Sequence, residues 1–547
     1  MSSFQARVQA KAEERRWLIL IVLCFSLLVI VLDNSILNVA IPTIQKELRA
    51  STSELQWMVD SYTLVFAGLL LTAGSLGDRF GRRPALQFGF IIFGLGSVLA
   101  AISGSAGELI GFRAFMGIGG AFIMPATLSI ITNVFPARER GRAIGIWAAT
   151  AGVAVALGPL TGGFLLEHFY WGSVFLVNIP IVVIGLLAGV FLIPDSKDPS
   201  TRKLDPVGAL LSIVSLSALL YSVIEAPERG WTDGATLTFF GVGAVLLALF
   251  FIWEVRRPDP MLDLSFFKNP RFSVASVSIM FTFFAMFGSL FVMTQYFQIV
   301  IGYSPIETGV RLLAFAIPMM VIAPMSSRFV ERLGAKVVIA IGLSLFAAGL
   351  LLSTGLDQSA DYGDIVWRIL VMAVGMAMIM APSTDSIMGS LPLARAGVGS
   401  AVNDTTRQVG GAVGVAVVGS VFASVYGSKV GELLTDAGSP NEVVRAARHS
   451  IVAAMRAAAR IGDEGLATAA KSAFVDGFHA GLYVGAGVLI VGVIAVSLWL
   501  PARARAEDID RQHAEWEAAR VPTGVREPFL HLGEPSTEHT FDSRPRL

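Results

Sequence analysis

Charged side chains and cysteine are both scarce in this chain. Asp, Glu, Lys and Arg make up 15% of the 547 residues, whereas 54% of the residues are hydrophobic and the mean hydropathy is +0.68. Soluble domains carry about 25% charged residues, and a soluble chain of this length needs that charge to cover its cores. The composition therefore argues against a soluble enzyme and against a disordered scaffold.

The charge that is present has no net sign, because 41 basic residues balance 41 acidic ones. We therefore expect no nucleic-acid partner. Cys24 is the only cysteine, which excludes an internal disulfide and a thiolate metal cluster. No histidine lies in the middle of an apolar run, and the motifs HExxH, GxxxxGK[ST] and GxSxG are missing. The sequence predicts no catalytic residue, no metal site and no cofactor.

Long apolar runs dominate the rest of the sequence. A membrane-spanning helix needs about 20 mostly apolar residues, and fourteen stretches of the chain meet this requirement. We therefore predict an all-α polytopic membrane protein with fourteen transmembrane helices. The predicted spans are 17–41, 57–77, 85–104, 109–134, 142–166, 171–193, 207–226, 236–254, 272–299, 309–330, 336–356, 366–389, 398–426 and 480–500.

The distribution of Lys and Arg between the loops predicts the orientation. With the N-terminus inside, the inner segments hold 24 basic residues and the short outer loops hold 5. Both termini are therefore expected in the cytoplasm, and the long segment 427–479, interrupted by weak helical pattern, is expected to face outward. The polar tail 501–547 is predicted to begin with a short amphipathic helix over 502–519, and we assign it no function.

Two predicted inner loops resemble each other. Gly74–Arg83 reads GSLGDRFGRR and Ser327–Lys336 reads SRFVERLGAK, so that an acid, an arginine, an apolar residue and a glycine align at an offset of 253 residues. Gly141 and Gly397, which open two other spans, pair at a similar offset. Two parallel six-helix halves are typical of secondary transporters with a site between the halves.

This repeat divides the chain into four parts. The prediction is a six-helix bundle over 1–196, an inserted helix pair over 197–258, a second six-helix bundle over 259–500 and a cytoplasmic tail over 501–547.

The first of the two loops has the chemistry of a latch between helices. Asp78 can lie at a helix N-terminus or pair with a nearby arginine, and glycine permits a tight turn. The alternative is a basic loop that only sets the topology. The predicted gating residues are Gly74, Asp78, Arg79, Gly81, Arg82 and Arg83.

Over roughly residues 15–500 the chain resembles the major facilitator superfamily, in its fourteen-helix drug:proton antiporter branch. Gly74–Arg83 is similar to the loop signature of the superfamily, and Leu109–Gly120, which contains Arg113, to its fourth-helix signature. Ala154–Gly163 resembles the fifth-helix signature that is associated with exporters, and Leu32–Pro42 resembles the first-helix signature of the branch.

The resemblance implies an exporter in a bacterial cytoplasmic membrane. Its fifth helix carries Gly158, Pro159, Gly162 and Gly163. Proline kinks a helix, and glycines let a neighbouring backbone approach closely. We predict that this helix makes a tight contact with the other half that excludes water and prevents proton leak. Ordinary close packing is the alternative.

Ionisable groups inside the spans are the candidates for proton coupling, since each costs about 2.5–3.5 kcal/mol to insert. Asp33 is the predicted proton carrier and Arg113 its tuning partner, and Asp60 and Asp404 are further candidates. A structural hydrogen bond is the alternative for Asp33. Asp385 and Asp404 would form an exit relay on the inner side or bind a cationic substrate.

The span 272–299 is rich in phenylalanine and methionine, which line adaptable apolar pockets. A lipid-facing helix would have the same composition, so this alternative stays open. The predicted substrate cavity consists of Asn34, Asn38, Phe287, Phe291, Gln295, Gln298 and Asp385.

Taken together, these features predict a proton-coupled antiporter that exports amphipathic drugs or toxic compounds. The expected partners are lipophilic small molecules, with organic cations as one option, together with protons and the lipid bilayer, and we expect a monomer. A dedicated exporter of one endogenous metabolite, antibiotic or lipid remains the main alternative. A polytopic membrane enzyme is a remote alternative, because paired catalytic groups at a membrane face are missing. The glycine-rich halves argue against a channel.

Overall fold

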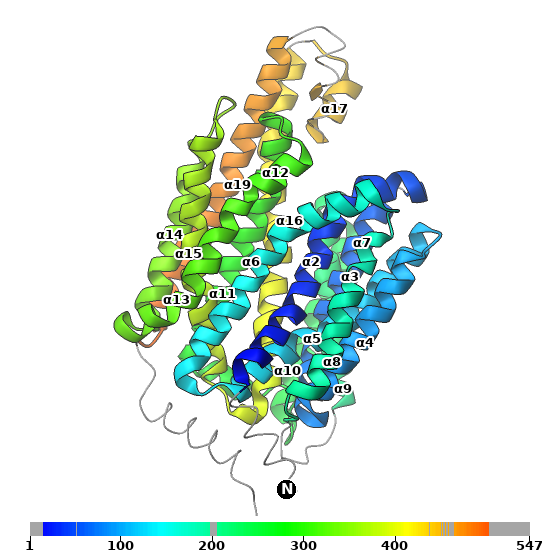
Figure 1. Ribbon diagram of the computed structural model, residues 1–547. Coiled ribbons are helices and arrows are strands. Elements are labelled where there is room, and N and C mark those ends of the chain that lie inside the picture. Colours follow the sequence, from blue (N-terminus) through cyan, green and yellow to red (C-terminus); the bar gives the residue numbers. More distant parts are fainter. Residues whose placement is uncertain are drawn as a thin grey trace, which may run out of the picture.

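The computed structural model is a bundle of long helices (Figure 1). It describes residues 15–50, 52–196, 205–436, 438–449, 451, 454–455, 458 and 464–502. The side chains of a few residues inside these ranges, Asn38 and Pro159 among them, lie outside the description. We call the end of the bundle at which α2 begins the basal end and the opposite end the apical end.

Seven helices form the first half of the bundle, which we call the N-half. They are α2 (Arg16–Leu48), α3 (Thr52–Phe80), α4 (Arg82–Ala101), α5 (Ala106–Val134), α6 (Ala137–His168), α7 (Ser173–Leu176) and α8 (Asn178–Leu192). In this half α5 packs between α3 and α4, and α2 packs on α6.

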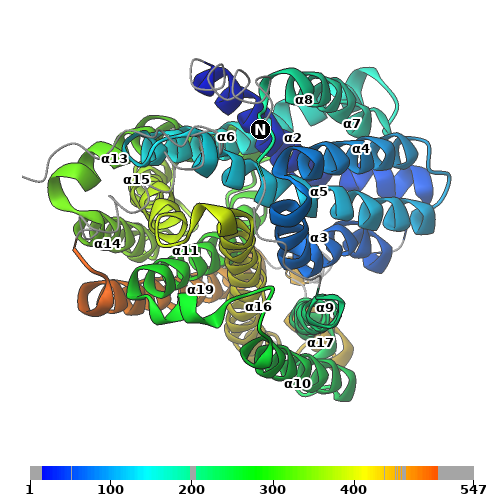
Figure 2. The same ribbon diagram turned by 90° about the horizontal axis from the view of Figure 1, so that it is seen from below.

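The C-half follows after two helices, α9 (Pro206–Arg229) and α10 (Gly234–Arg256). It consists of η1 (Leu264–Lys268), α11 (Pro270–Gln295), η2 (Tyr296–Val300), α12 (Pro305–Leu312), η3 (Leu313–Phe315), α13 (Ala316–Leu333), α14 (Ala335–Ser353), α15 (Tyr362–Met388), η4 (Leu393–Arg395), α16 (Ala396–Asp436), α17 (Asn441–His449) and α19 (Glu464–Trp499). Seen from below, the two halves lie side by side, and α9 and α10 lie at one edge beside α16 (Figure 2).

Local signals in the sequence explain where the helices begin and turn. Ser105 caps α5 by accepting from the Glu108 N–H, and Asp233 caps α10 in the same way. Gly81 and Gly334 join α3 to α4 and α13 to α14 with φ angles of +119° and +84°, which favour glycine. These two glycines are 253 residues apart, so the repeat seen in the sequence is also a repeat of backbone shape.

The burial pattern is that of a protein in a bilayer. In the described part of the chain, thirteen helices are long and apolar enough to cross a membrane. Of the most apolar stretch of α5, 78% is buried, whereas for α10 the value is 17%. Phe191 on α8 and Leu498 on α19 are 78% and 65% exposed, as expected for lipid-facing side chains. The chain is therefore an all-helical, multi-pass membrane protein.

Two boundaries differ most from those that the hydropathy predicts. The segment 427–479 is helical over much of its described length, because α16 continues to Asp436 and α19 begins at Glu464 rather than at 480. Hydropathy predicts only the part of a helix that lies within the bilayer, whereas residues with high helix propensity allow the helix to continue beyond the membrane surface. The amphipathic helix predicted over 502–519 lies, from residue 503 onward, outside the described residues.

Candidate functional site

A buried ion pair joins Asp33 of α2 to Arg113 of α5. Asp33 is 2% exposed and Arg113 is fully buried. Arg113 also donates from Nε to the Met58 carbonyl of α3 and from Nη2 to Asn34 Oδ1, both at 3.1 Å. One guanidinium thus joins three helices of the N-half, about 10 Å from the apical end of α5.

Two side chains that the sequence did not single out complete this cluster. Asn178, at the start of α8, donates to Asp33 Oδ1 at 2.8 Å and to Ser97 Oγ of α4 at 3.2 Å. The ring of Tyr62 lies 4.5 Å from the Arg113 guanidinium. A buried pair needs such extra hydrogen bonds to offset its desolvation. The charge on Asp33 is therefore linked to how α2, α5 and α8 are held together.

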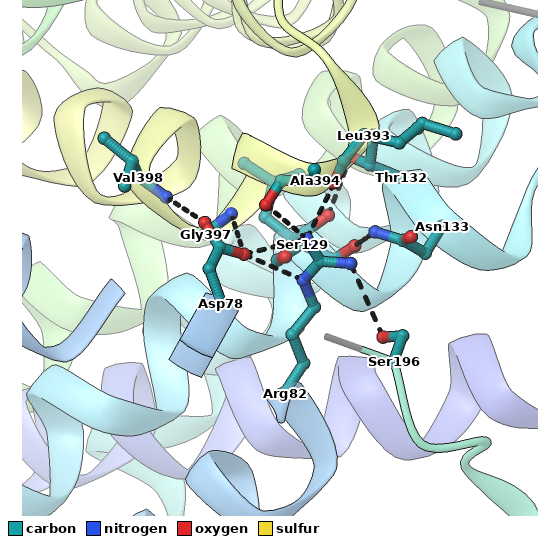
Figure 3. A network of polar contacts seen from close by, with 11 residues as sticks. Asp78, Arg82, Ser129, Thr132, Asn133, Ser196, Leu393, Ala394, Gly397 and Val398 are labelled. Atoms are coloured by element: carbon teal, nitrogen blue, oxygen red, sulfur yellow. Dashed lines mark hydrogen bonds and ion pairs between the residues drawn. The ribbon is translucent and has the colours of Figure 1, made fainter. Parts of the chain in front are cut away.

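A second polar network joins the two halves at the basal end, as Figure 3 shows. Asp78, near the end of α3, accepts from the backbone N–H groups of Gly397 and Val398 at 2.9 and 3.0 Å. Arg82 pairs with Asp78 at 2.8 Å and donates to the Leu393 carbonyl at 2.7 Å. We call Asp78, Arg82 and the segment Leu393–Val398 the basal latch.

The N-terminus of α16 provides the positive electrostatic environment that binds the Asp78 carboxylate in the latch. Gly397 and Val398 are in the first turn of α16, where N–H groups lack partners within the helix and the dipole favours a negative charge. Asp78 supplies that charge and is buried, as is Arg82. Opening the latch therefore separates a buried carboxylate from its donors, which is costly unless water replaces them.

Glycines let the two helices meet at the latch. A Cβ on Gly74 would lie 2.6 Å from the Gly397 carbonyl oxygen, and a Cβ on Gly397 would lie 2.6 Å from the Gly74 carbonyl oxygen. No real side chain fits at such distances without moving the backbone. Of the remaining predicted loop residues, Gly81 makes the turn, and Arg79 and Arg83 are half-buried.

An ion pair closes the basal end at a second place. Arg140 Nε, near the start of α6, lies 2.9 Å from Asp385 Oδ1, near the end of α15. A Cβ on Gly141 would lie 3.9 Å from the same carboxylate. The structure places Asp385, which the sequence predicted in a substrate cavity or an exit relay, in a contact between the halves.

The fourth predicted coupling residue, Asp404 of α16, is also buried and lies 3.7 Å from Arg407 Nη1. Arg407 donates to Thr384 Oγ1 at 3.0 Å. Its guanidinium also lies 5.3 Å from the ring of Trp147 on α6 and 5.4 Å from the ring of Phe283 on α11. Asp404 Oδ2 and Arg407 Nε are buried without a hydrogen-bond partner. This acid–arginine pair therefore lies where the two halves touch, and it is less satisfied than the pair at Asp33.

A protein-family model matches more than half of the chain. The model of the Major Facilitator Superfamily matches residues 23–415. The chain belongs to the major facilitator superfamily.

Relatives of this chain include bacterial proteins named for efflux and export. The chain is 36% identical over 491 residues to the "Multidrug efflux pump LfrA" of Mycolicibacterium smegmatis, covering 90% of this chain and 95% of the relative. It is 33% identical over 449 residues to the "Tetracenomycin C resistance and export protein" of Streptomyces glaucescens, covering 82% of each chain. The predicted family is thereby confirmed, and transporter relatives indicate a transporter rather than an enzyme.

A solved structure confirms the fold of the superfamily. The structure of the proton:xylose symporter XylE superposes with a TM-score of 0.57 over 90% of this chain and 98% of that chain, at 14% identity. At this identity the likeness concerns the fold alone.

The glycines of α6 contact a different partner from the predicted one. A Cβ on Gly158 would lie 2.3 Å from Ser35 Cβ, and one on Gly162 would lie 3.3 Å from Ile36 Cγ2. Ser35 and Ile36 belong to α2 of the same half, so the predicted contact of these glycines with the other half is wrong. The contact of α6 with the C-half is made further down, where a Cβ on Gly145 would lie 2.5 Å from the Ala323 carbonyl oxygen of α13.

Replacing Gly158 with alanine is therefore expected to destabilise the protein by about 1–3 kcal/mol through overpacking, because α2 and α6 must separate. Gly163 is a matched control on the same helix, since nothing lies within 4 Å of its Cβ position. The yield of monodisperse purified protein and its thermal midpoint would measure the effect. Equal behaviour of Gly158→Ala and Gly163→Ala would contradict the close contact.

The predicted substrate residues are not gathered in one place. Asn34 belongs to the Asp33 cluster, and Gln298 is exposed near the apical end of the C-half. Phe287 and Phe291 lie one turn apart on α11 and are each 40% exposed. Asp60 is half-buried near the apical start of α3. The side chains of Asn38 and Pro159 lie outside the described residues.

Phe287 and Phe291 belong to a longer stripe along α11. Phe283 lies one turn below Phe287, with ring centroids 5.9 Å apart, and it is the ring that faces Arg407. Gln295 continues the stripe at the apical end and lines a cavity of about 820 Å³. The stripe thus leads from Arg407 to an apical cavity.

The apical cavity lies between the α9–α10 turn, α11, α16 and the segment beyond α16. Trp231 in the turn donates to Ser420 Oγ of α16 at 2.7 Å. Other lining side chains include Phe422, Tyr426, Arg448 and Phe474. In the part of the chain that the structure describes, no group of three or more His, Cys, Asp or Glu residues is arranged to hold a metal ion.

Proposed function

We propose that this chain is a proton-coupled antiporter that exports amphipathic drugs or other toxic compounds across the bacterial cytoplasmic membrane. The observation that carries the proposal is the Asp33–Arg113 pair, in which a buried titratable acid of α2 is bonded to Arg113 of α5 and to Asn178 of α8. Two relatives named for multidrug efflux and for tetracenomycin export support the export part.

Protonation of Asp33 would act on the packing of the N-half. A proton cancels the attraction between Asp33 and Arg113, whereas Arg113 keeps its charge under all conditions. Arg113 would then be held by Asn34 and the Met58 carbonyl, and the bond from Asn178 would be weakened. Loading the proton from one side and releasing it on the other supplies about 2.3 kcal/mol per 100 mV of membrane potential.

The basal latch would be the inner gate of this cycle. We assign the basal end to the cytoplasm, which agrees with the excess of basic residues in the segments at that end. The latch and the Arg140–Asp385 pair are both formed in the structure, so under this assignment it would represent a state with the inner side closed. The aromatic stripe from Phe283 to Phe291 would carry the lipophilic substrate, and Asp404 would attract a cationic one.

The proposed architecture has fourteen spans. The thirteen helices that meet the length and hydropathy criteria do not include α6, whose 32 residues are also long enough to cross the bilayer. Counting α6 gives two bundles of six spans with α9 and α10 inserted between them. No cofactor is required, because the proton gradient drives the cycle, and we propose that the transporter acts as a monomer.

A dedicated exporter of one host-made compound is the second candidate function. The relative from Streptomyces glaucescens, whose name assigns it to a single compound, favours this candidate. The two candidates differ in substrate range and share the same mechanism.

Efflux of a fluorescent lipophilic cation tests the proposal. Cells that lack their own major efflux pumps are expected to extrude ethidium several-fold faster when they express the chain, and a protonophore is expected to abolish the gain, because the proton gradient supplies the driving force. A panel of unrelated lipophilic compounds separates a multidrug exporter from a dedicated one. Extrusion that persists with the protonophore, in cells that keep their ATP, would contradict proton coupling.

A further inference from the structure

The helix pair α9–α10 lies against both halves, on the two helices that carry the basal latch. α9 packs on α3 and on α16, and α10 packs on α9 (Figure 2). Gly68 of α3 gives room to α9, since a Cβ there would lie 2.6 Å from Ser217 Oγ. At the apical end the bond from Trp231 to Ser420 ties the pair to α16. A pair that touches both halves must respond when the halves move.

The chain segments that lead into and out of this pair are each bound to one side of the latch. On the entering side, the Arg82 backbone N–H donates to the Ser196 carbonyl at 2.9 Å. On the leaving side, Arg395 donates from Nη1 and Nη2 to the Pro260 carbonyl at 3.3 and 3.4 Å. Arg82 and Arg395 are both latch residues, the first in the N-half and the second directly before α16, so the pair is attached to both sides of the latch.

A buried acid at the end of α10 shapes the leaving segment. Glu254 is 2% exposed, and its Oε2 accepts from the Leu262 N–H at 3.1 Å, eight residues further along. Its other oxygen, Oε1, is buried without a hydrogen-bond partner. Met261 and Leu262 are buried as well. The carboxylate thus bonds the segment after α10 back to the end of that helix, at a residue two positions beyond Pro260.

Burial of the Glu254 carboxylate lowers the free energy of unfolding unless its hydrogen bonds compensate for the lost water. An ionisable group out of water needs its hydrogen bonds, and Glu254 has one oxygen without any. A second carboxylate is close, since a Cβ on Gly208 would lie 2.7 Å from Glu254 Oε1 and 2.4 Å from Asp205 Oδ2. Arg257 lies 3.5 Å from Asp205. A leucine at position 254 would avoid the cost of burying the carboxylate, but it would leave the buried Leu262 N–H without this acceptor.

Arg395 passes this positioning on to the latch. It lies in η4, is 8% exposed and is followed at once by α16. The two carbonyls before it, of Leu393 and Ala394, accept from Arg82 at 2.7 and 3.3 Å. The N–H groups that bind Asp78 come two and three residues after it. Fixing Arg395 therefore orients both the acceptors and the donors of the latch.

We propose that Glu254 and Arg395 are positioning residues of the basal latch, through which the α9–α10 pair holds the start of α16 in the closed geometry. Glu254 sets the Pro260 carbonyl, this carbonyl holds Arg395, and Arg395 holds the latch segment. The α9–α10 helix pair would then stabilise the closed basal latch, in addition to connecting the two bundles.

A distance measurement across the basal end tests this role. Replacing Cys24 with serine gives a cysteine-free chain, and spin labels at Pro84→Cys on α4 and Val337→Cys on α14 report the separation of the halves at two exposed positions. The open fraction is expected to rise about tenfold in Arg395→Ala, the effect of losing a hydrogen bond from a charged donor. Glu254→Leu is expected to have a similar effect.

Conservative variants separate positioning from a loss of folding. Glu254→Gln keeps an oxygen that accepts from the Leu262 N–H, so its distance distribution is expected to match that of the parent. Glu225→Gln is a control acid on α9 that pairs with Arg229 at the apical end, away from the latch, and it is expected to have no effect. A shift in Glu254→Gln as large as that in Glu254→Leu would overturn the proposal.

A double-mutant cycle completes the test. Asp78→Asn opens the latch directly, so adding Arg395→Ala to it is expected to change the open fraction much less than Arg395→Ala does alone. Fully additive effects, or unchanged distances in both Arg395→Ala and Glu254→Leu, would overturn the proposal. The distance readout needs no transported compound, so failure here is distinguishable from failure of the export function.

Discussion

Replacing Asp33 with asparagine is expected to reduce proton-driven export to the level of protein-free vesicles. Asparagine keeps the shape of the side chain and an acceptor for Arg113, but it does not titrate, so the cycle loses the group that carries the proton. Arg113 retains the Met58 carbonyl and Asn34 as partners. The measurement is substrate flux into or out of proteoliposomes under an imposed pH gradient.

Further measurements distinguish a loss of proton coupling in Asp33→Asn from misfolding of the variant. Removing one partner of a buried pair destabilises a protein by about 3–5 kcal/mol, so exchange of labelled substrate without a gradient must show that Asp33→Asn still binds and moves it. Asp33→Glu, which restores a titratable group, is expected to regain part of the gradient-driven flux. Asp364→Asn removes an exposed acid at the start of α15 and serves as the matched control. Unchanged pH-driven flux in Asp33→Asn would show that the proton is carried elsewhere.

The scarcity of charged residues in the spans was enough to identify two members of the Asp33 cluster from the sequence, but not the others. Asp33 and Arg113 stood out because charges inside spans are rare, and spacing along a helix gave their depth. Depth does not give the direction in which a side chain points around the helix axis, so Asn178 and Tyr62 could not be paired with them from the sequence. Asn178 is the one neutral polar residue of the apolar stretch 174–192, and this was the available signal for it.

The repeat marked turns within each half rather than the contacts between the halves. The offset of 253 residues pointed to Gly81 and Gly334, and both have positive φ angles. The acids of the two loops differ, however: Asp78 is buried in the latch, whereas Glu331 is exposed. On that side the Arg140–Asp385 pair joins the halves instead. A repeat preserves the fold of each half, whereas the interface is made of whichever residues the two halves bring together.

Replacing Gly397 with alanine is expected to abolish export as completely as the change at Asp33, by a different route. The new Cβ would lie 2.6 Å from both Asp78 Oδ1 and the Gly74 carbonyl oxygen. The Gly74 backbone lies on one side of the new Cβ. On the other side lies the buried Asp78 carboxylate, which is held by two backbone hydrogen bonds. Neither group is the end of a flexible side chain that could move aside. The helices α3 and α16 must therefore separate at the basal end, and the latch cannot close.

The measurement is the fraction of protein whose basal end is open, by spin-label distance, together with substrate flux. Gly397→Ala is expected to be trapped with the basal end open, so substrate still binds from that side while net export stops. Gly74→Ala should do the same, because its Cβ would meet the Gly397 carbonyl oxygen at the same distance. Gly111→Ala on α5 and Gly241→Ala on α10 are matched controls, since nothing lies within 4 Å of either Cβ position. Export at the parent rate by Gly397→Ala would mean that the cycle does not pass through the closed latch, and the latch would then be a feature of topology rather than a gate.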